Sequence, residues 1–283
     1  MERLPRYGVV EAPGKLVLLG EYAVLDGAAA VVAAVDRGVR CTVSPGREIT
    51  TPGDDRFVRA ALAGAPVAHY HFEDSRPVRG IDGKPGFGGS AAATVAAVIA
   101  AGLPSERAAE LHAAVQGGGS GIDVFASLMG GVRRFRDGAV LACPPIVAVW
   151  SGQSASTGPR VQQYLAWPGR SDFVAESARL VAAFASEPIR ATREAYLLLT
   201  SMTEAAGIAY DLPAFREASA LAVAHGGAAK PSGAGGGDIA VALLPDPEAL
   251  AAFTRACDQV GLHTIDVNVA PAAGWVGSGL DGG

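Results

Sequence analysis

Two glycine-rich segments lie far apart in this chain, and any fold must place both in turns whose main-chain amides are largely uncovered by side chains. The first reads Gly86-Phe-Gly-Gly-Ser-Ala-Ala and opens an apolar run, and the second reads Lys230-Pro-Ser-Gly-Ala-Gly-Gly-Gly-Asp. Glycine permits positive φ angles that align successive N–H groups, and it has no side chain to keep an anion away. The two segments therefore predict two anion-binding loops, one for donor phosphates and one for an acceptor.

The chain is long enough for one large domain or two modest ones, and its composition excludes several classes of protein. Of its 283 residues, 49% are apolar, which predicts a well-filled core rather than disorder. The net charge is −5 and basic residues cluster only at Arg133-Arg134-Phe135-Arg136, so we expect no nucleic-acid partner. Residues 91–103 are too short to span a bilayer, and the first residues lack a signal-peptide core. We expect a cytoplasmic protein without a membrane partner, either a monomer or a homodimer.

Cysteine usage argues against two further kinds of structure. Cys41, Cys143 and Cys257 are odd in number, widely separated and in no Cys-x-x-Cys pair. This pattern disfavours a disulfide framework and a zinc site. We expect the three thiols to be buried as small apolar groups.

The N-terminal half alternates strand-like runs with turn residues. Strands are predicted at residues 8–11, 16–19, 29–35, 39–43, 67–72, 132–135 and 146–150. Helices are predicted at residues 55–63 and 90–101, the second apolar on every side, as is typical of a buried helix. Ser105 is expected to cap another helix that ends before Gly117, and Ser120 to cap the next one.

From about residue 154 the pattern changes to helices, and strands return later. Helices are predicted at residues 158–165, 172–185, 188–205, 212–224 and 247–260, and strands at 238–244 and 263–269. Asp246 is expected to cap the last helix. The chain is therefore interpreted as an α+β fold of two units, residues 1–153 and 154–283.

The first glycine cluster has two other interpretations besides a phosphate-binding loop. Its Gly86-x-Gly88-x-x-Ala91 spacing fits the relaxed dinucleotide-binding fingerprint, but that fingerprint needs an apolar strand immediately before it. Residues 76–85 contain charges, glycine and prolines and make a poor strand. The cluster could instead simply cap a buried helix. As an anion site, it would combine free N–H groups with the helix dipole, and Ser90 could offer its hydroxyl to Mg²⁺.

Two charged residues are candidates for chemistry beside that loop. Asp123 follows Gly117-Gly-Gly-Ser-Gly-Ile, where a helix N-terminus would keep its carboxylate ionised, as suits a base or simply a capping residue. Lys15 stands between a turn and an apolar strand, so its ammonium group either faces the site or is solvated.

Four segments together are more specific than any one of them. They begin at Glu11 (Glu-Ala-Pro-Gly-Lys-Leu-Val-Leu-Leu-Gly-Glu-Tyr), Gly86, Gly117 and Lys230. In this order they resemble the motifs of small-molecule kinases of the GHMP superfamily, over roughly residues 9–244. The segment at Lys230 most resembles that of phosphomevalonate kinases. The resemblance implies an N-terminal ribosomal-protein-S5-like domain and a C-terminal ferredoxin-like domain.

The same resemblance implies a role for individual residues. Asp123 and Lys15 would be catalytic, and Ser90 would help to hold Mg²⁺. ATP would be bound by Gly86, Phe87, Gly88, Gly89, Ser90, Ala91 and Ala92. The acceptor would be bound by Lys15, Glu21, Tyr22, Lys84, Ser120, Gly121, Ser232, Gly233 and Ala234. Arg133, Thr157 and Arg160 are further candidates for acceptor contacts.

The chain departs from the family pattern in three places. Gly89 replaces the first serine of the usual Gly-Leu-Gly-Ser-Ser-Ala, which removes one hydroxyl and keeps the main-chain loop. His112 aligns with a magnesium-binding glutamate of mevalonate kinases, and a neutral imidazole is a poorer Mg²⁺ ligand than a carboxylate. The chain is also short between residues 52 and 85, where adenine-binding elements are expected.

The expected activity is ATP-dependent phosphorylation of 5-phosphomevalonate to 5-diphosphomevalonate, a step of isoprenoid precursor synthesis. Mevalonate kinase and diphosphomevalonate decarboxylase are alternatives on the same scaffold. A protein of this fold that binds a metabolite as a sensor, without turnover, is an alternative of another class.

Overall fold

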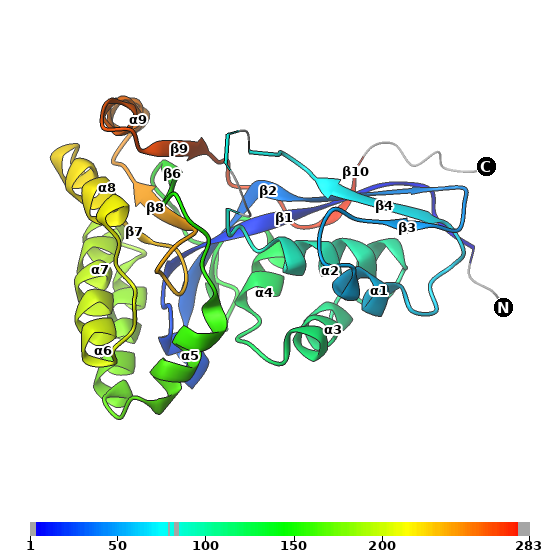
Figure 1. Cartoon of the computed structure of the whole chain (residues 1–283), viewed down its shortest axis with the longest axis horizontal. Coiled ribbons are helices and arrows are strands. Elements are labelled where there is room, and N and C mark those ends of the chain that lie inside the picture. The colour runs from blue at the N-terminus through cyan, green and yellow to red at the C-terminus, as the bar shows by residue number, and fades with distance from the viewer. Residues whose placement is uncertain (1–3, 79, 82–84, 277–283) are drawn as a thin grey trace.

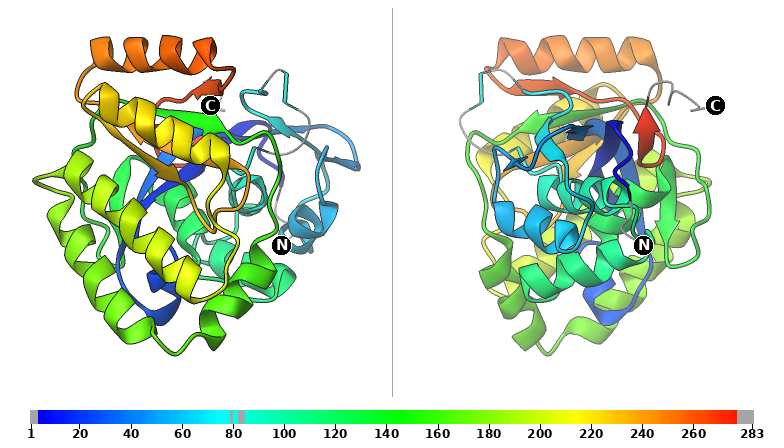
Figure 2. Two further views of the ribbon diagram at one scale, coloured as in Figure 1. Left: turned by 60° about the vertical axis from the view of Figure 1, so that its left-hand side comes forward. Right: turned by 90° about the vertical axis from the view of Figure 1, so that its right-hand side faces the viewer.

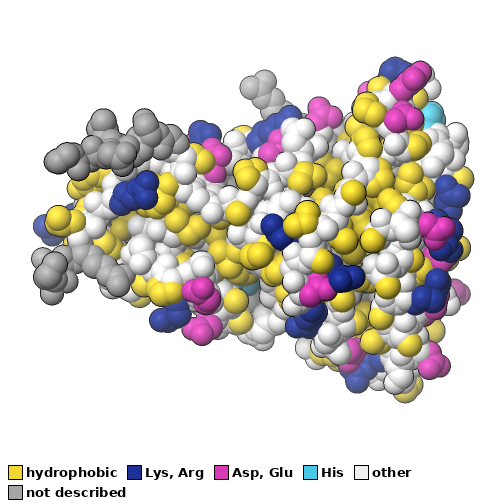
Figure 3. Space-filling model, turned by 180° about the vertical axis from the view of Figure 1, so that it is seen from behind, with side chains coloured by type: hydrophobic (Ala, Val, Ile, Leu, Met, Phe, Trp, Pro, Cys, Tyr) yellow, Lys and Arg dark blue, Asp and Glu magenta, His cyan; other side chains and the backbone are white. Residues whose placement is uncertain are grey.

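The computed structural model describes residues 4–78, 80–81 and 85–276, which form two sheets and the helices that cover them (Figure 1). In this part of the chain, no helix is both long and apolar enough to cross a membrane. On the face seen in Figure 3, acidic and basic side chains are interspersed.

The first sheet is built on two long neighbouring strands. Its members are β1 Gly8–Leu19, β2 Ala30–Ser44, β3 Ile49–Thr50, β4 His69–Asp74, β5 Val132–Phe135 and β10 Gly274–Val276. Their order is β10-β1-β2-β4-β3, and β5 pairs with the first part of β2. Because β10 comes from the C-terminal end, segments from both ends of the described chain meet in one sheet.

β1 and β2 are each continuous, and the prediction of two short strands for each was wrong. The residues that were predicted as turns include two glycines at which the main chains of β1 and β2 lie very close together. A Cβ atom on Gly14 would lie 2.1 Å from the Arg37 carbonyl oxygen, and one on Gly38 would lie 2.0 Å from that of Ala12. The register shifts between Ala12 and Gly14, so these glycines form a bulge rather than a break. Lys15 therefore remains on the strand, immediately after the bulge.

Four helices lie on one side of the first sheet, and two of them pack directly on its strands (Figure 1). They are α1 Asp55–Leu62, α2 Gly89–Ala100, α3 Arg107–Gln116 and α4 Ile122–Met129. The central helix, α2, contacts β1, β2 and the other three helices, which explains why it is apolar on every side.

The second sheet contains four antiparallel strands in the order β7-β8-β6-β9. They are β6 Ile146–Trp150, β7 Ala228–Pro231, β8 Ile239–Leu243 and β9 His263–Asp266. This is the strand order of a ferredoxin-like fold, as expected. β7 was not predicted, because the segment at Lys230 was interpreted only as a loop.

Alternate residues of β6 and β8 face two different apolar layers. Val147 and Val149 pack with α8 Pro213–Ala224 and α9 Pro247–Gln259, which lie on the outer side of the sheet (Figure 2). Ala148 and Trp150 face the other way, into a core shared with β1, β2 and two helices, α6 Arg170–Ala183 and α7 Pro188–Ala205. The two sheets thus bury apolar side chains against each other.

The predicted boundary between residues 153 and 154 does not follow the two sheets. β6 precedes the boundary and lies in the second sheet, whereas β10 follows it and lies in the first. The division into two domains remains a proposal.

Two of the predicted helix caps were wrong and one is confirmed. α3 begins after Glu106 rather than after Ser105. α4 begins after Gly121, whose left-handed φ of 77° turns the chain into the helix without a side-chain cap. Asp246 caps α9 as predicted, since its carboxylate accepts a hydrogen bond of 2.8 Å from the Ala249 amide.

Candidate active site

Lys15 and Asp123 lie together beneath the first glycine loop. The Lys15 main-chain amide donates to the Phe87 carbonyl (2.8 Å), and its ammonium group donates to the Gly86 carbonyl (3.5 Å). Asp123 occupies the second position of α4, and its Oδ1 lies 3.8 Å from Lys15 Nζ. Only 10% of the Lys15 side chain is exposed, which strengthens its electrostatic interactions.

Gly88 places the main chain directly over this ion pair. It has a left-handed φ of 77°, and a Cβ atom there would lie 3.2 Å from Lys15 Cγ and 3.4 Å from Asp123 Oδ2. Gly88 is also the residue from which α2 begins. An anion at this helix start would therefore meet both the helix dipole and the buried ammonium group.

The first turn of α2 differs from the prediction in one respect. The Ala91 and Ala92 amides donate to the Gly88 carbonyl, each at 3.1 Å, so they are not free for an anion as was predicted for Ala91. Gly89 and Ser90 are exposed, and a Cβ atom on Gly89 would meet nothing within 4 Å. The accessible part of the loop is therefore Gly88 to Ser90.

The Ser90 hydroxyl lies 3.2 Å from Nε2 of His112, which is buried on α3. The imidazole stacks on Phe57 of α1, with ring centroids 5.1 Å apart. Burial lowers the pKa of His112, and the negative charge of Asp123 opposes this shift. The histidine that departs from the family pattern is thus bonded to the predicted metal-binding serine.

The residues near Ser90 suit a magnesium ion that is carried mainly by nucleotide phosphates. Among the described residues, no group of three or more His, Cys, Asp or Glu side chains could hold a metal by itself. Mg²⁺ usually keeps several waters and binds through one or two protein oxygens and substrate phosphates. The Ser90 hydroxyl and the Asp123 carboxylate are oxygens of this kind.

The second glycine segment contacts the first through Asp238. A Cβ atom on Gly86 would lie 2.7 Å from Asp238 Cβ, so only glycine fits there. Asp238 has a left-handed φ of 57°, and its Oδ1 accepts a hydrogen bond of 3.0 Å from the Ala155 amide. Burial raises the pKa of Asp238, while the charges of Lys15 and Arg160 act in the opposite direction. Asp238 has no role in the sequence-based prediction, although a non-glycine residue that ends a run of three glycines is a signal.

Ser232 and Ala234 connect the second glycine segment to the region of β1. The Ser232 hydroxyl accepts a hydrogen bond of 2.8 Å from the Val17 amide, near an irregularity in the β1 register. The Tyr22 hydroxyl donates to the Ala234 carbonyl at 2.6 Å. Gly233, between them, is half-buried with open space around its Cα. The segment is therefore held at both sides of Gly233.

Glu21 and Lys230 form a buried ion pair behind this loop. Both side chains are almost completely buried, and Lys230 Nζ also donates to the Pro231 carbonyl at 2.9 Å. Burial lowers the pKa of Lys230, which Glu21 opposes and the charge of Lys15 reinforces. Glu21 Oε2 has no hydrogen-bond partner among the described residues. The sequence pattern does not predict this pairing, because Glu21 and Lys230 are distant in the chain.

Ser120, Gly121 and Lys84 are the remaining residues of the predicted acceptor site. Ser120 and Gly121 form the turn into α4, where Ser120 Oγ accepts a weak hydrogen bond of 3.4 Å from the Ile122 amide. Lys84 lies outside the described residues.

Of the three additional candidates, Arg160 is the one beside the second glycine segment. Its guanidinium donates to the Ala209 carbonyl (2.8 Å) and to that of Gly236 (3.4 Å). Arg133 instead donates to the main-chain carbonyls of Met129, Gly130 and Gly138, the last at 2.8 Å. Thr157 is the first residue of helix α5, Thr157–Ala166.

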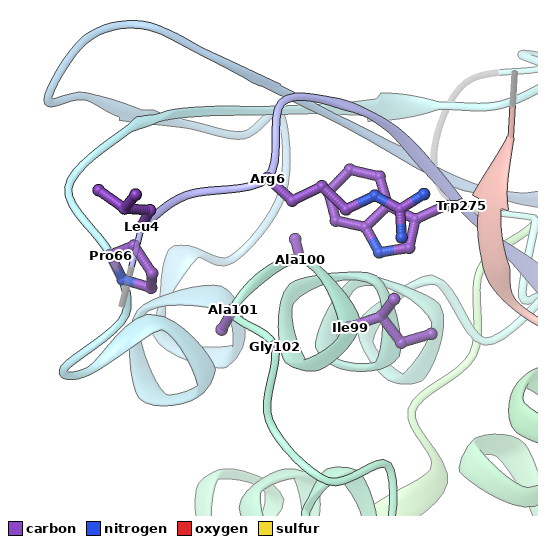
Figure 4. Close-up of a pocket in the computed structure, with 8 residues that line it drawn as sticks. All are labelled: Leu4, Arg6, Pro66, Ile99, Ala100, Ala101, Gly102 and Trp275. Atoms are coloured by element: carbon purple, nitrogen blue, oxygen red, sulfur yellow. The ribbon is translucent and has the colours of Figure 1, made fainter. Parts of the chain in front are cut away.

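One open cavity lies elsewhere in the molecule. It has a volume of about 250 Å³ and lies between the N-terminal segment and the end of α2 (Figure 4). Its lining is Leu4, Arg6, Pro66, Ile99, Ala100, Ala101, Gly102 and Trp275. None of these is a predicted site residue, so the cavity does not mark the candidate active site.

No protein-family profile and no curated protein matches the sequence. Solved structures match over nearly the full length. A Lin0012 protein from Listeria innocua is 22% identical, with a TM-score of 0.82 over 95% of this chain and 99% of that one. The Streptococcus pneumoniae phosphomevalonate kinase in complex with phosphomevalonate and AMPPNP is 18% identical, with a TM-score of 0.75 over 92% and 99%. The Methanococcus jannaschii mevalonate kinase is 14% identical, with a TM-score of 0.76 over 93% and 98%.

Proposed function

Since the chain has the GHMP kinase fold, we propose that it transfers the γ-phosphoryl group of ATP to a small phosphorylated acceptor, with 5-phosphomevalonate preferred. The observation that carries this proposal is the meeting of the two glycine segments over one ion pair. Gly88 covers Lys15 and Asp123, and Gly86 contacts Asp238 at the end of the second segment. A donor in one loop and an acceptor in the other would face each other across Lys15.

Lys15 is suited to stabilise the charge that moves between donor and acceptor. Phosphoryl transfer needs positioning and charge stabilisation and little covalent chemistry from the protein. The Lys15 ammonium group is held in place by the Gly86 carbonyl and by Asp123, and it is shielded from water. Bound Mg²⁺ would neutralise phosphate charge, with Ser90 and Asp123 as its protein oxygens.

The role of Asp123 depends on the acceptor. The second pKa of a phosphate monoester is about 6, so such an acceptor is mostly ionised at neutral pH and needs little deprotonation. Asp123 would then orient Lys15 and the metal. An alcohol acceptor must lose a proton, and Asp123 would act as its general base. We expect Asp123→Asn to lower turnover more with mevalonate than with 5-phosphomevalonate, whereas near-normal turnover on both would remove Asp123 from the mechanism.

Similar structures support this substrate class by analogy. The S. pneumoniae kinase is described in complex with phosphomevalonate and a nonhydrolysable ATP analogue, and the M. jannaschii protein is a mevalonate kinase. A shared fold accommodates different substrates, so the choice within this group rests on the segment at Lys230.

The direct test is to incubate the purified protein with Mg-ATP and, separately, mevalonate, 5-phosphomevalonate and 5-diphosphomevalonate. ADP release is followed and the products are identified by mass. Formation of a diphosphate from 5-phosphomevalonate alone supports the proposal. Turnover of another of the three acceptors would reassign the substrate, and ligand binding without turnover of any would favour the sensor alternative.

Two variants sharpen the assay. Lys15→Met keeps the length of the buried side chain and removes its charge, and we expect turnover to fall by a factor of about 10² or more. Arg190→Met removes an exposed charge on α7, where Arg190 pairs with Glu187 and Glu194, and serves as the matched control with unchanged turnover. Equal activity of both variants would contradict the role of Lys15.

A further inference from the structure

The contact between Ser90 and His112 suggests how the serine is prepared for a cation. Ser90 is exposed in the first turn of α2, whereas His112 is only 7% exposed, and Ser90 Oγ lies 3.2 Å from His112 Nε2. The Ser90 carbonyl also accepts a hydrogen bond of 2.8 Å from the Thr94 hydroxyl one turn later. Both the main chain and the side chain of Ser90 are thus held from within the protein.

A hydroxyl group can bind a cation only through an oxygen lone pair, and its proton must point elsewhere. A neutral imidazole has one protonated and one unprotonated nitrogen, and the unprotonated one accepts hydrogen bonds. With the proton on Nδ1, His112 Nε2 can accept a hydrogen bond from the Ser90 hydroxyl. Both lone pairs of the serine oxygen are then directed away from the histidine.

We propose that His112 is a positioning residue that accepts a hydrogen bond from the Ser90 hydroxyl and so presents the serine oxygen to the divalent cation of a bound nucleotide. This inference rests on the proposed function, because it requires a metal–nucleotide complex at the start of α2. His112 acts through Ser90 and does not itself touch the metal or the phosphates.

The surroundings of the ring support this role. Phe57 stacks on the imidazole at 5.1 Å and fixes its plane, and α1 and α3 pack against each other and hold both rings in place.

Two other roles for His112 make different predictions. As a direct metal ligand it would need Nε2 free, but that nitrogen faces the serine hydroxyl, and imidazole suits Mg²⁺ poorly. As a packing residue only, it could be replaced by phenylalanine, which would keep the stack on Phe57.

The test is the affinity for AMPPNP, measured by titration calorimetry with Mg²⁺ and again in its absence. His112→Phe keeps an aromatic ring and loses the acceptor, His112→Gln offers an amide oxygen near the position of Nε2, and Ser90→Ala removes the hydroxyl. We expect His112→Phe to weaken Mg-AMPPNP binding about five- to tenfold, the effect of one lost hydrogen bond. Metal-free AMPPNP affinity should be unchanged, and His112→Gln should restore most of the loss.

The double variant Ser90→Ala/His112→Phe decides whether the histidine acts through the serine. We expect it to bind Mg-AMPPNP no more weakly than Ser90→Ala alone. The inference is overturned if His112→Phe binds Mg-AMPPNP like the wild type. It is also overturned if adding His112→Phe to Ser90→Ala weakens binding as much as His112→Phe does in the wild type. If His112→Phe fails to fold, His112→Met is compared with His112→Gln. Equal affinities of these two variants for Mg-AMPPNP would overturn the inference. Absence of AMPPNP binding by the wild type would instead refute the proposed function, and this inference with it.

Discussion

Gly88 and Gly89 are neighbours in sequence with opposite surroundings. Gly88 has a left-handed φ of 77°, and a Cβ atom there would press on Lys15 and Asp123, whereas the Cα of Gly89 faces open space. A residue with a side chain in the left-handed region costs about 1–2 kcal/mol. The two positions therefore provide a matched pair of substitutions.

We expect Gly88→Ala to lower the free energy of unfolding by about 1–2 kcal/mol and to weaken Mg-ATP binding. Gly89→Ala should leave stability within about 0.5 kcal/mol of wild type, because the added methyl group meets nothing. Urea unfolding and nucleotide titration measure the two effects. Equal behaviour of the variants would show that neither the left-handed φ nor the ion pair constrains Gly88.

His112 should make the stability of the protein depend on pH. The pKa of a histidine in the unfolded chain is about 6.5, and burial lowers that of His112 in the folded state. Between these two values the unfolded state binds more protons, so stability is highest above pH 6.5 and falls as the pH is lowered through the folded pKa. Urea midpoints measured from pH 8 to pH 5 should decline less in His112→Gln. Parallel curves for the two proteins would contradict the lowered pKa.

At the scale of elements, the ion pair of Glu21 and Lys230 joins the loop after β1 to strand β7. Removing one partner of a buried pair leaves an uncompensated charge and costs about 3–5 kcal/mol, whereas replacing both is often far less harmful. We expect Lys230→Met to show a loss of this size in urea unfolding and Glu21→Gln/Lys230→Met to recover much of it. The single variant Glu21→Gln is measured as well. If the loss in the double variant equals the sum of the losses in Glu21→Gln and Lys230→Met, the two charges do not interact.

At the scale of the whole molecule, the two sheets share one apolar core. β1 and β2 pack with β6, β8, α6 and α7, and β6 lies in the middle of the second sheet although it precedes residue 153. We expect residues 1–153 and 154–283, expressed separately, to show no cooperative unfolding transition, because each fragment would expose this core. Circular dichroism and urea titration of each fragment test this. A cooperative transition in either fragment would support the domain boundary at residue 153 instead.

Much of the site was predictable because glycine leaves a local signature. The loop at Gly88 follows from the positive φ angle that glycine permits. The start of α4 was instead assigned to a Ser120 cap, although Gly121 makes the turn into the helix. The bulge at Gly14 was wrongly predicted as a break between two strands. Only the neighbouring strand shows why glycine is needed there, because its main chain lies too close for a side chain. β7 was missed for a similar reason, because its residues look like a loop until β8 pairs with them.

By itself, the sequence determined the apolar helix α2, the glycine loops and the run of helices after residue 154, because these depend on residue type, spacing and local φ and ψ preferences. Only the tertiary structure decided which side chains meet. Asp238 against Gly86, Lys230 against Glu21 and His112 against Ser90 join segments that are distant in sequence. Such contacts depend on how helices and sheets pack around a shared core, which no local pattern records.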